Sequence, residues 1–293
     1  MTPSEVNYDN RPQWFLNPYK KPPEPPGTDE IQSWTVAITE DIRGESGHHP
    51  LRTTRRLGAL ADWYHMSGDE GYLEKAAEIA DNLISEHTTE LDGGYYFNYG
   101  FEFQIQTDYT RQPPWFSCMS QGTGLSAFLR LYEATEDQRF QEFAEKTYQC
   151  FLNLRSISPK AWVAFCDDSQ HLWLSEYPEP GLPLRVLNGA IIGLWGPYEY
   201  WLVTGDDSAK EYVQAVVTTL REHAMEYRNP EEKSYYALTE KHLVPDHYHR
   251  LHIYQMRQLA KFANEPFFDE VADVFLKDRP DLGWKDCDSL RCE

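Results

Sequence analysis

Long hydrophobic runs are missing from the 293-residue chain. No stretch of about 18 consecutive apolar residues occurs, so we expect no membrane-spanning helix. The first residues, MTPSEVNYDNRPQ, contain neither the basic segment nor the apolar segment of a signal peptide. The sequence therefore predicts no signal peptide and favours a cytoplasmic location.

Cysteine is scarce, and its spacing fits no metal site. The five cysteines are an odd number in no recognised ligand pattern. We expect reduced thiols that are mostly buried, with a disulfide between the last two as the less favoured alternative. These residues are Cys118, Cys150, Cys166, Cys287 and Cys292. The sequence accordingly predicts neither a bound metal nor a cofactor.

Positive charge is in short supply. Lysine and arginine number 27 against 47 aspartates and glutamates, which gives a formal net charge of −20 at pH 7. Such a surface repels nucleic acid and other polyanions at low salt. We therefore expect no nucleic-acid partner.

Proline is concentrated near the start of the chain. Residues 20–27, KKPPEPPG, cannot form a helix because proline fixes φ and lacks an N–H donor. We expect residues 1–50 to form an extended arm over the body of the protein, docked by Trp14, Phe15 and Tyr19. A flexible tail is the alternative.

Apolar residues recur at helical spacing through most of the remaining chain, residues 51–293. Leu57, Leu60 and Tyr64, for example, share one helix face. Eight such segments pair through short turns of small residues, and four helical hairpins predict a mainly α fold, an α/α toroid or partial α/α barrel. Short β-hairpins near residues 95–107 and 161–174 are expected at the rim of the cleft.

Residues 234–255 bring phenols and imidazoles together. A phenol has a reference pKa near 10, so it suits proton exchange with a carbon acid that is itself reluctant to ionise. Two further segments read PWFSCMSQG at residues 114–122 and EYP at residues 176–178, the latter followed by LNG at residues 187–189. The phenols and imidazoles of the first segment are Tyr236, Tyr248, His247, His249 and His252.

These motifs, in this order, resemble the C-terminal helical domain of the D-glucuronyl C5-epimerases. That family shows a PW-x-S-x-M-x-QG segment, an EYP followed by LNG, a short tyrosine strand and a YH-x-x-HI-x-Q helix. The resemblance covers roughly residues 51–280 and implies a catalytic domain with the same α/α architecture. It also implies conversion of D-glucuronate to L-iduronate residues within a heparosan-like polysaccharide, by a homodimer that needs no cofactor.

The resemblance implies catalytic and substrate-binding roles for particular residues. A C5-epimerase removes the proton next to a uronate carboxylate and returns one to the opposite face of the sugar, so it needs two proton-transfer groups. The match implies that Tyr177, Tyr236 and Tyr248 are catalytic, with Tyr235 replacing Tyr236 if the alignment shifts by one residue. The residues expected to bind substrate are Glu176, Asn188, Gln121, Met119, His249, Arg250, Arg185 and Trp115.

One position departs from the family pattern. The family places an arginine three residues after the strand tyrosine, where it can hold the uronate carboxylate. Here that position is Thr239. We expect the cationic role to move to Arg185, Arg250 or Lys241, and we favour Arg250.

Three other interpretations compete with an epimerase. A uronate polysaccharide lyase would share the removal of the C5 proton and then expel the C4 substituent. A non-catalytic module that binds acidic glycans could use an aromatic rim of Trp115, Trp162 and Trp173. The three histidines of residues 247–252 could be a metal cluster, although their spacing matches no standard zinc signature.

The implied substrate is itself a polyanion, which conflicts with the acidic composition. A high-salt source would remove the conflict, because molar salt shortens the Debye length to ~3 Å. We therefore expect a halophile protein whose activity rises with salt concentration.

Overall fold

The computed structural model describes residues 25–40, 44, 46–105 and 108–282. Within these residues, Cys118 and Cys150 are buried free thiols and Cys166 is an exposed one. Five residues with predicted roles lie outside the described part of the chain: Trp14, Phe15, Tyr19, Cys287 and Cys292. No helix in the described part is both long and apolar enough to cross a lipid bilayer.

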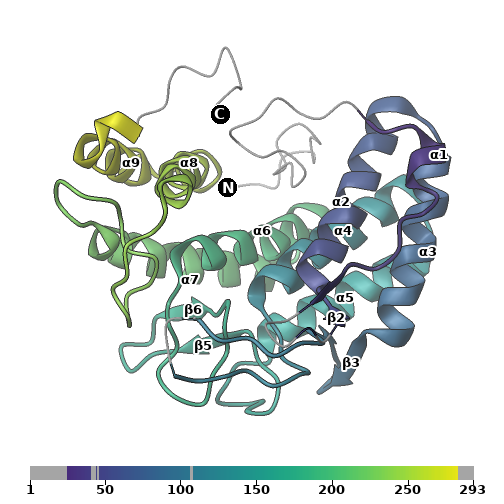
Figure 1. The fold of residues 1–293 in the computed structure, drawn as a ribbon, viewed down its shortest axis with the longest axis horizontal. Coiled ribbons are helices and arrows are strands. Elements are labelled where there is room, and N and C mark those ends of the chain that lie inside the picture. The colour runs from purple at the N-terminus through teal and green to yellow at the C-terminus, as the bar shows by residue number, and fades with distance from the viewer. Residues whose placement is uncertain (1–24, 41–43, 45, 106–107, 283–293) are drawn as a thin grey trace.

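The described chain is mainly helical, with short strands (Figure 1). The helices are α1 (Thr28–Ile31), α2 (Pro50–Ser67), α3 (Gly71–Glu86), α4 (Cys118–Thr135), α5 (Gln138–Leu152), α6 (Leu187–Thr204), α7 (Asp207–His223), α8 (Asp246–Ala263) and α9 (Phe267–Asp278), with the 3-10 helices η2 (Ala224–Tyr227) and η3 (Pro280–Leu282). The strands are β1 (Ile38–Glu40), β2 (Ser46–His48), β3 (Thr88–Leu91), β4 (Gly94–Phe97), β5 (Ala164–Cys166) and β6 (Leu172–Leu174).

Eight of these helices form hairpins in chain order: α2 with α3, α4 with α5, α6 with α7, and α8 with α9. Figure 1 shows α2 and α3 at one side of the molecule and α8 and α9 at the other, with α4 to α7 between them. The prediction of a mainly α fold, an α/α toroid built from four helical hairpins, is confirmed.

The strands form antiparallel pairs within the described residues: β1–β2, β3–β4 and β5–β6. The last pair agrees with the hairpin expected within residues 161–174. The hairpin expected at residues 95–107 is wrong, because the turn at Asp92 and Gly93 folds β4 back onto β3 instead. Downstream, Phe103 pairs with Arg111 only as an isolated bridge.

The described part of the N-terminal arm packs against α3. The Tyr72 hydroxyl donates to the Pro26 carbonyl at 2.5 Å, and the Lys75 ammonium donates to the Gln32 carbonyl at 2.8 Å. Ile31 is fully buried in the main core. Residues 25–50 therefore contain the short elements α1, β1 and β2 rather than one extended stretch.

The helices α2, α4 and α6 contact one another near their N-termini. The hydroxyls of Thr54 in α2 and Thr123 in α4 are 2.6 Å apart, and Cys118 of α4 donates to the Gly189 carbonyl of α6. Gln255, in the middle of α8, donates to the Asn188 carbonyl in the first turn of α6. In Figure 1 the labelled strands lie together on one side of the molecule.

A buried charge cluster joins three of these helices near their C-terminal ends. Arg130 of α4 pairs with Asp62 of α2 at 2.5 Å and with Glu199 of α6 at 2.6 Å. All three side chains are at most 2% exposed. Because an unpaired charge in such surroundings is costly, this cluster fixes how the three helices align.

Replacement of Arg130 should therefore destabilise the fold strongly. In Arg130→Met, two carboxylates lose their cation inside the core, and we expect a loss of ~3–5 kcal/mol in unfolding free energy at pH 7. Denaturant titration measures this loss. A matched control is Arg139→Met, whose ion pairs with Asp81 and Asp137 are partly exposed and are worth at most ~1 kcal/mol. Equal losses in the two variants would contradict a special role for the cluster.

Candidate active site

The Glu176 carboxyl group is buried at the N-terminal end of α6. It follows β6 by two residues and is only 7% exposed. A Cβ atom at position 189 would lie 2.1 Å from the Glu176 Oε2 atom, so the glycine of the LNG motif makes room for the carboxyl group. Burial raises the pKa of Glu176 to about 7, although tyrosine hydrogen bonds and the charges of Arg55 and Arg111 oppose the increase.

Two phenols meet at this carboxyl group. The hydroxyls of Tyr177 and Tyr236 are 3.3 Å apart. The Tyr236 hydroxyl also lies 3.5 and 3.4 Å from the two Glu176 carboxylate oxygens and donates to them. Burial, with the Glu176 charge adding to it, raises the pKa of both tyrosines well above the ordinary value near 10. Both phenols are therefore neutral at pH 7 and can exchange protons with Glu176.

Tyr248 approaches the same group from α8. Its ring centroid is 5.7 Å from that of Tyr236, and the two ring planes are nearly perpendicular. Burial raises the pKa of Tyr248, the Glu176 charge raises it further, and the Arg55 charge lowers it. The three tyrosines of the sequence prediction thus lie together, and they come from three separate segments of the chain.

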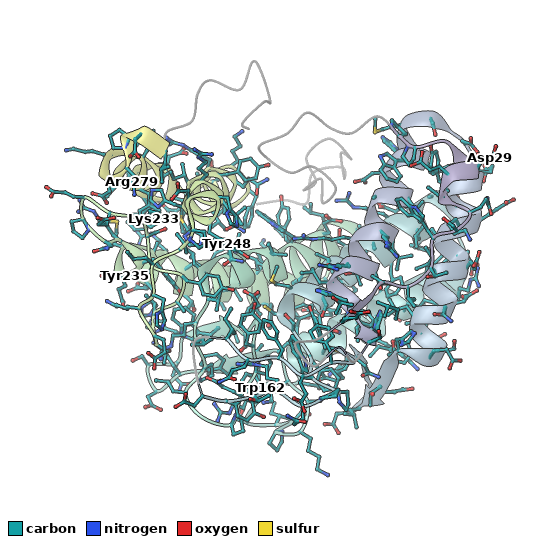
Figure 2. All side chains as sticks on the ribbon, viewed as in Figure 1. Asp29, Trp162, Lys233, Tyr235, Tyr248 and Arg279 are labelled. Atoms are coloured by element: carbon teal, nitrogen blue, oxygen red, sulfur yellow. The ribbon has the colours of Figure 1, made fainter. Side chains whose placement is uncertain are left out.

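The neighbouring Tyr235 lies elsewhere. Its hydroxyl donates to the Asn229 Oδ1 atom at 3.2 Å, and the Lys241 ammonium lies 5.3 Å from the centre of its ring. Figure 2 shows Tyr248 beside α8 and Tyr235 farther toward the edge of the molecule. The structure therefore brings Tyr236, and neither Tyr235 nor Lys241, to Glu176.

An arginine that the sequence prediction missed holds the segment of Tyr177 in place. The Arg111 Nη2 atom donates to the Tyr177 carbonyl at 3.3 Å and pairs with the buried Glu179 carboxylate at 3.0 Å. Its guanidinium also lies 5.1 Å from the centre of the Tyr177 ring. Trp115, expected to bind substrate, is 8% exposed, and its ring centroid is 6.3 Å from that of Tyr177. Trp115 therefore belongs to the aromatic cluster that packs against Tyr177.

A second missed arginine, Arg55, lies on the second turn of α2. Desolvation lowers the pKa of Arg55, and electrostatic interactions with Tyr99, Tyr248 and Glu176 oppose the decrease. The side chain is exposed to solvent, so a ligand can reach it. No hydrogen bond or ion pair to Arg55 is present within the described residues, so its donors are available to a ligand.

Several expected substrate-binding residues have structural partners instead. The Gln121 amide accepts from the Phe97 N–H at 2.9 Å and donates to the Tyr95 carbonyl at 2.6 Å. The His249 Nδ1 atom accepts from the Ser234 N–H, and its Nε2 atom lies 3.1 Å from the Phe275 carbonyl oxygen. Gln121 therefore ties a hairpin to α4, and His249 ties α8 to α9.

The favoured cation, Arg250, and the alternative Arg185 contact other groups than the tyrosines. The Arg250 Nε atom donates to the Leu282 carbonyl at 3.3 Å, on the side of α8 that faces η3. The Arg185 guanidinium lies 5.0 Å from the centre of the Trp173 ring and 3.9 Å from an Asp167 oxygen. The geometry assigns neither residue to the Glu176 cluster.

Asn188 and Met119 stay close to the candidate site. Both lie in the first turns of inner helices, α6 and α4, and both are at most 6% exposed. The Asn188 Oδ1 atom is buried and has no hydrogen-bond partner within the described residues. Asn188 precedes Gly189, the residue that lies against the Glu176 carboxyl group.

The three histidines of residues 247–252 do not form a metal cluster. His247 is exposed beside Tyr248, with ring centroids 4.7 Å apart. His249 and His252 both contact Ser234 through their Nδ1 atoms. Burial lowers the pKa of His252 to about 3, so this imidazole is neutral. Their role in the described structure is to bind the segment of Tyr236 to α8.

Because the pKa of Glu176 is raised, we expect the unfolding free energy of the protein to depend on pH. A carboxyl group with a raised pKa binds its proton more tightly in the folded state, so it lowers the unfolding free energy as pH rises from about 4.5 to 7. Each pKa unit corresponds to ~1.4 kcal/mol, so Glu176→Gln should become more stable relative to the wild type by about 3 kcal/mol between pH 4.5 and pH 8. Denaturant titration across this range measures the difference, with exposed Glu240→Gln as a control. A difference independent of pH would contradict the assignment.

Comparison with solved structures supports this fold. The cellobiose 2-epimerase from Bacillus thermoamylovorans B4167 has a TM-score of 0.60 at 12% identity, over 79% of this chain and 59% of that chain. The cellobiose 2-epimerase from Spirochaeta thermophila DSM 6192 has a TM-score of 0.56 at 16% identity, over 79% and 58% of the two chains. A GH76 α-mannanase from Bacteroides thetaiotaomicron has a TM-score of 0.51 at 13% identity, over 81% and 62%.

At these identities the likeness concerns the fold alone. The chain also spans less than two thirds of the length of each of these structures. A family model gives a more specific match, because the model described as D-glucuronyl C5-epimerase C-terminus matches residues 91–277. This match covers more than half of the chain and includes Glu176 and all three clustered tyrosines, and the chain belongs to the family of the D-glucuronyl C5-epimerase C-terminus.

Proposed function

We propose that this protein is a carbohydrate epimerase that inverts C5 of D-glucuronate residues within a heparosan-like polysaccharide, giving L-iduronate. Family membership supports a carbohydrate-modifying activity. The observation that carries the specific reaction is the buried Glu176 carboxyl group, hydrogen-bonded to Tyr236 and flanked by Tyr177 and Tyr248. No other group of phenols in the described structure shares a carboxyl group of raised pKa in this way.

Proton removal from C5 uses Tyr236 and Glu176. The Tyr236 oxygen takes the C5 proton while its own proton passes to the ionised Glu176 carboxylate. The electron pair left on C5 delocalises into the uronate carboxyl group. A Glu176 pKa of about 7 suits this step, because a group that titrates near the working pH both accepts and releases a proton readily. Tyr177 stabilises the arrangement through its hydroxyl contact with Tyr236.

Proton return uses Tyr248. In this scheme it gives its hydroxyl proton to C5 from the opposite face of the sugar, which completes the inversion and leaves a phenolate. Burial and the Glu176 charge raise the pKa of Tyr248, and the charge of Arg55 opposes this increase and stabilises the phenolate that forms. The proton held by Glu176 then returns to Tyr248 through solvent, which restores both groups.

Arg55 binds the uronate carboxylate in this proposal. It takes the role that the family gives to the arginine at the position of Thr239, whose hydroxyl here donates to the Pro183 carbonyl instead. Negative charge builds on the uronate carboxyl group as C5 loses its proton, and a positioned cation stabilises that charge. The partial positive charge at the N-terminus of α6, where Gly189 lies against Glu176, acts in the same direction.

Removal of single hydroxyl groups tests the proton-transfer roles. Tyr236→Phe and Tyr248→Phe should each reduce kcat by ~10²–10⁴-fold, because each removes a general acid–base group without changing the ring. Conversion of glucuronate to iduronate is measured by disaccharide analysis, with Tyr235→Phe as the matched control. Retention of activity in both site variants would contradict the proposal. An unsaturated, ultraviolet-absorbing product from the wild-type enzyme would instead identify a lyase.

Substitution of the two competing arginines separates their roles. Arg55→Gln should lower kcat/KM by ~10²–10³-fold, the usual effect of removing a donor that stabilises developing negative charge. Arg250→Gln removes a hydrogen bond to η3 and should leave kcat/KM within a few-fold of wild type. The opposite order of effects would return the carboxylate-binding role to Arg250.

A further inference from the structure

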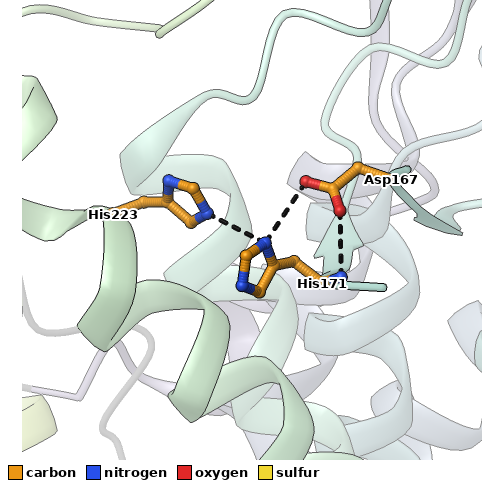
Figure 3. A group of neighbouring side chains, drawn as sticks. All are labelled: Asp167, His171 and His223. Atoms are coloured by element: carbon orange, nitrogen blue, oxygen red, sulfur yellow. Dashed lines mark hydrogen bonds and ion pairs between the residues drawn. The ribbon is translucent and has the colours of Figure 1, made fainter. Parts of the chain in front are cut away.

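A second group of functional side chains lies outside the tyrosine cluster, where the β5–β6 hairpin meets the end of α7. Asp167 follows β5, His171 precedes β6, and His223 is the last residue of α7. Figure 3 shows the three side chains turned toward one another. The proposed epimerase reaction uses none of them.

The distances between the three groups suit a tetrahedral metal ion. The His171 Nδ1 atom is 3.2 Å from the His223 Nε2 atom and 3.5 Å from an Asp167 carboxylate oxygen. All three ligand atoms lie within 4.8 Å of one another. Zinc binds imidazole nitrogen and carboxylate oxygen at about 2.0–2.2 Å, which places neighbouring ligand atoms about 3.4 Å apart in a tetrahedral site. Only a small movement of Asp167 or His223 would complete this geometry.

The surrounding groups orient these atoms as they do in known metal sites. The His223 Nδ1 atom lies 2.6 Å from the Glu226 carboxylate, which fixes the proton on Nδ1 and leaves Nε2 free to bind a cation. The Asp167 carboxylate accepts from the His171 N–H at 2.9 Å and from the Trp173 indole N–H at 2.9 Å. The side chains of His223 and Asp167 are therefore held in position without a bound ion.

The site is open to solvent on one side. Its three residues are half-buried and line a cavity of about 560 Å³, so a water molecule can fill a fourth coordination position. The positive charge of Arg185 opposes cation binding at this site, because its Nη2 atom lies 3.9 Å from the Asp167 carboxylate. Its guanidinium stacks on Trp173, however, and makes no closer contact with that carboxylate.

We propose that Asp167, His171 and His223 bind one divalent cation of the zinc class, which fastens the β5–β6 hairpin to α7. Two imidazoles and a carboxylate favour zinc and its transition-metal neighbours over magnesium and calcium. The site is structural, because it supplies no group to the tyrosine cluster. Since β6 ends two residues before Glu176, a bound ion would also steady the segment that carries this carboxyl group.

Zinc titration of the tag-free, chelator-treated protein tests this site. Isothermal calorimetry in excess Mg²⁺ is the appropriate measurement, because Mg²⁺ occupies the many surface carboxylates and leaves imidazole sites open. We expect one zinc ion per chain and a rise in melting temperature on zinc addition. The double variant His171→Ala/His223→Ala should lose both effects, whereas His65→Ala, at an exposed histidine in the last turn of α2, should keep them.

Two milder variants keep the test valid if the double variant folds poorly. Glu226→Gln removes only the carboxylate that orients His223 and should weaken zinc binding by ~10–100-fold. Arg185→Met removes the opposing charge and should tighten zinc binding several-fold. Two results would overturn the proposal. One is wild-type protein that binds zinc no more tightly than the double variant, and the other is an unchanged zinc affinity in both Glu226→Gln and Arg185→Met. The contact between His171 and His223 would then be only a hydrogen bond between two imidazoles.

Discussion

The candidate site depends on one buried carboxyl group that forms no ion pair with any residue that the structure describes. Glu176 lies against Gly189 at the start of α6 and is satisfied by phenolic hydroxyls instead of a salt bridge. A direct ion pair would hold the pKa of the carboxyl group low, whereas burial among phenols raises it to about 7. The same burial keeps the phenols protonated. The result is a set of groups that exchange protons at neutral pH.

The helical scaffold places positive charge beside this set. The N-terminal turns of α2, α4 and α6 contact one another, and the charge of Arg55 acts on Glu176 from α2. The chain as a whole carries a net charge of −20, so Arg55 is a local positive charge on an acidic protein. It lessens the conflict between that acidic protein and the proposed uronate substrate, and the halophile origin stays a prediction.

Much of the fold could be predicted because local signals and packing agree. Gly68 and Gly205 end α2 and α6, and the helical spacing of apolar residues identifies the paired helices between such turns. Only motif resemblance points to the tyrosines, since nothing in the local sequence around Tyr177, Tyr236 or Tyr248 shows that their side chains meet.

The remaining site residues could not be read from the sequence, because their roles depend on which helix face points inward. Arg250 lies among the histidines of the motif, yet it projects from α8 toward η3. Arg55 has no motif around it, but α2 is an inner helix and carries it to the tyrosines. Gln121 and His249 belong to motif segments and serve packing. Motif position therefore identifies the segments whose tyrosines lie together, but it does not identify the charged and amide groups beside them.

In the proposed function, phenols exchange a proton with C5 of a glucuronate residue. The most direct test is incubation of a glucuronate-containing, heparosan-type polysaccharide with the enzyme in heavy water, followed by mass spectrometry and NMR of the sugar. Deuterium at C5, in both iduronate and recovered glucuronate, is the predicted result. Absence of deuterium at C5 across a range of salt concentrations and uronate polymers would contradict the account.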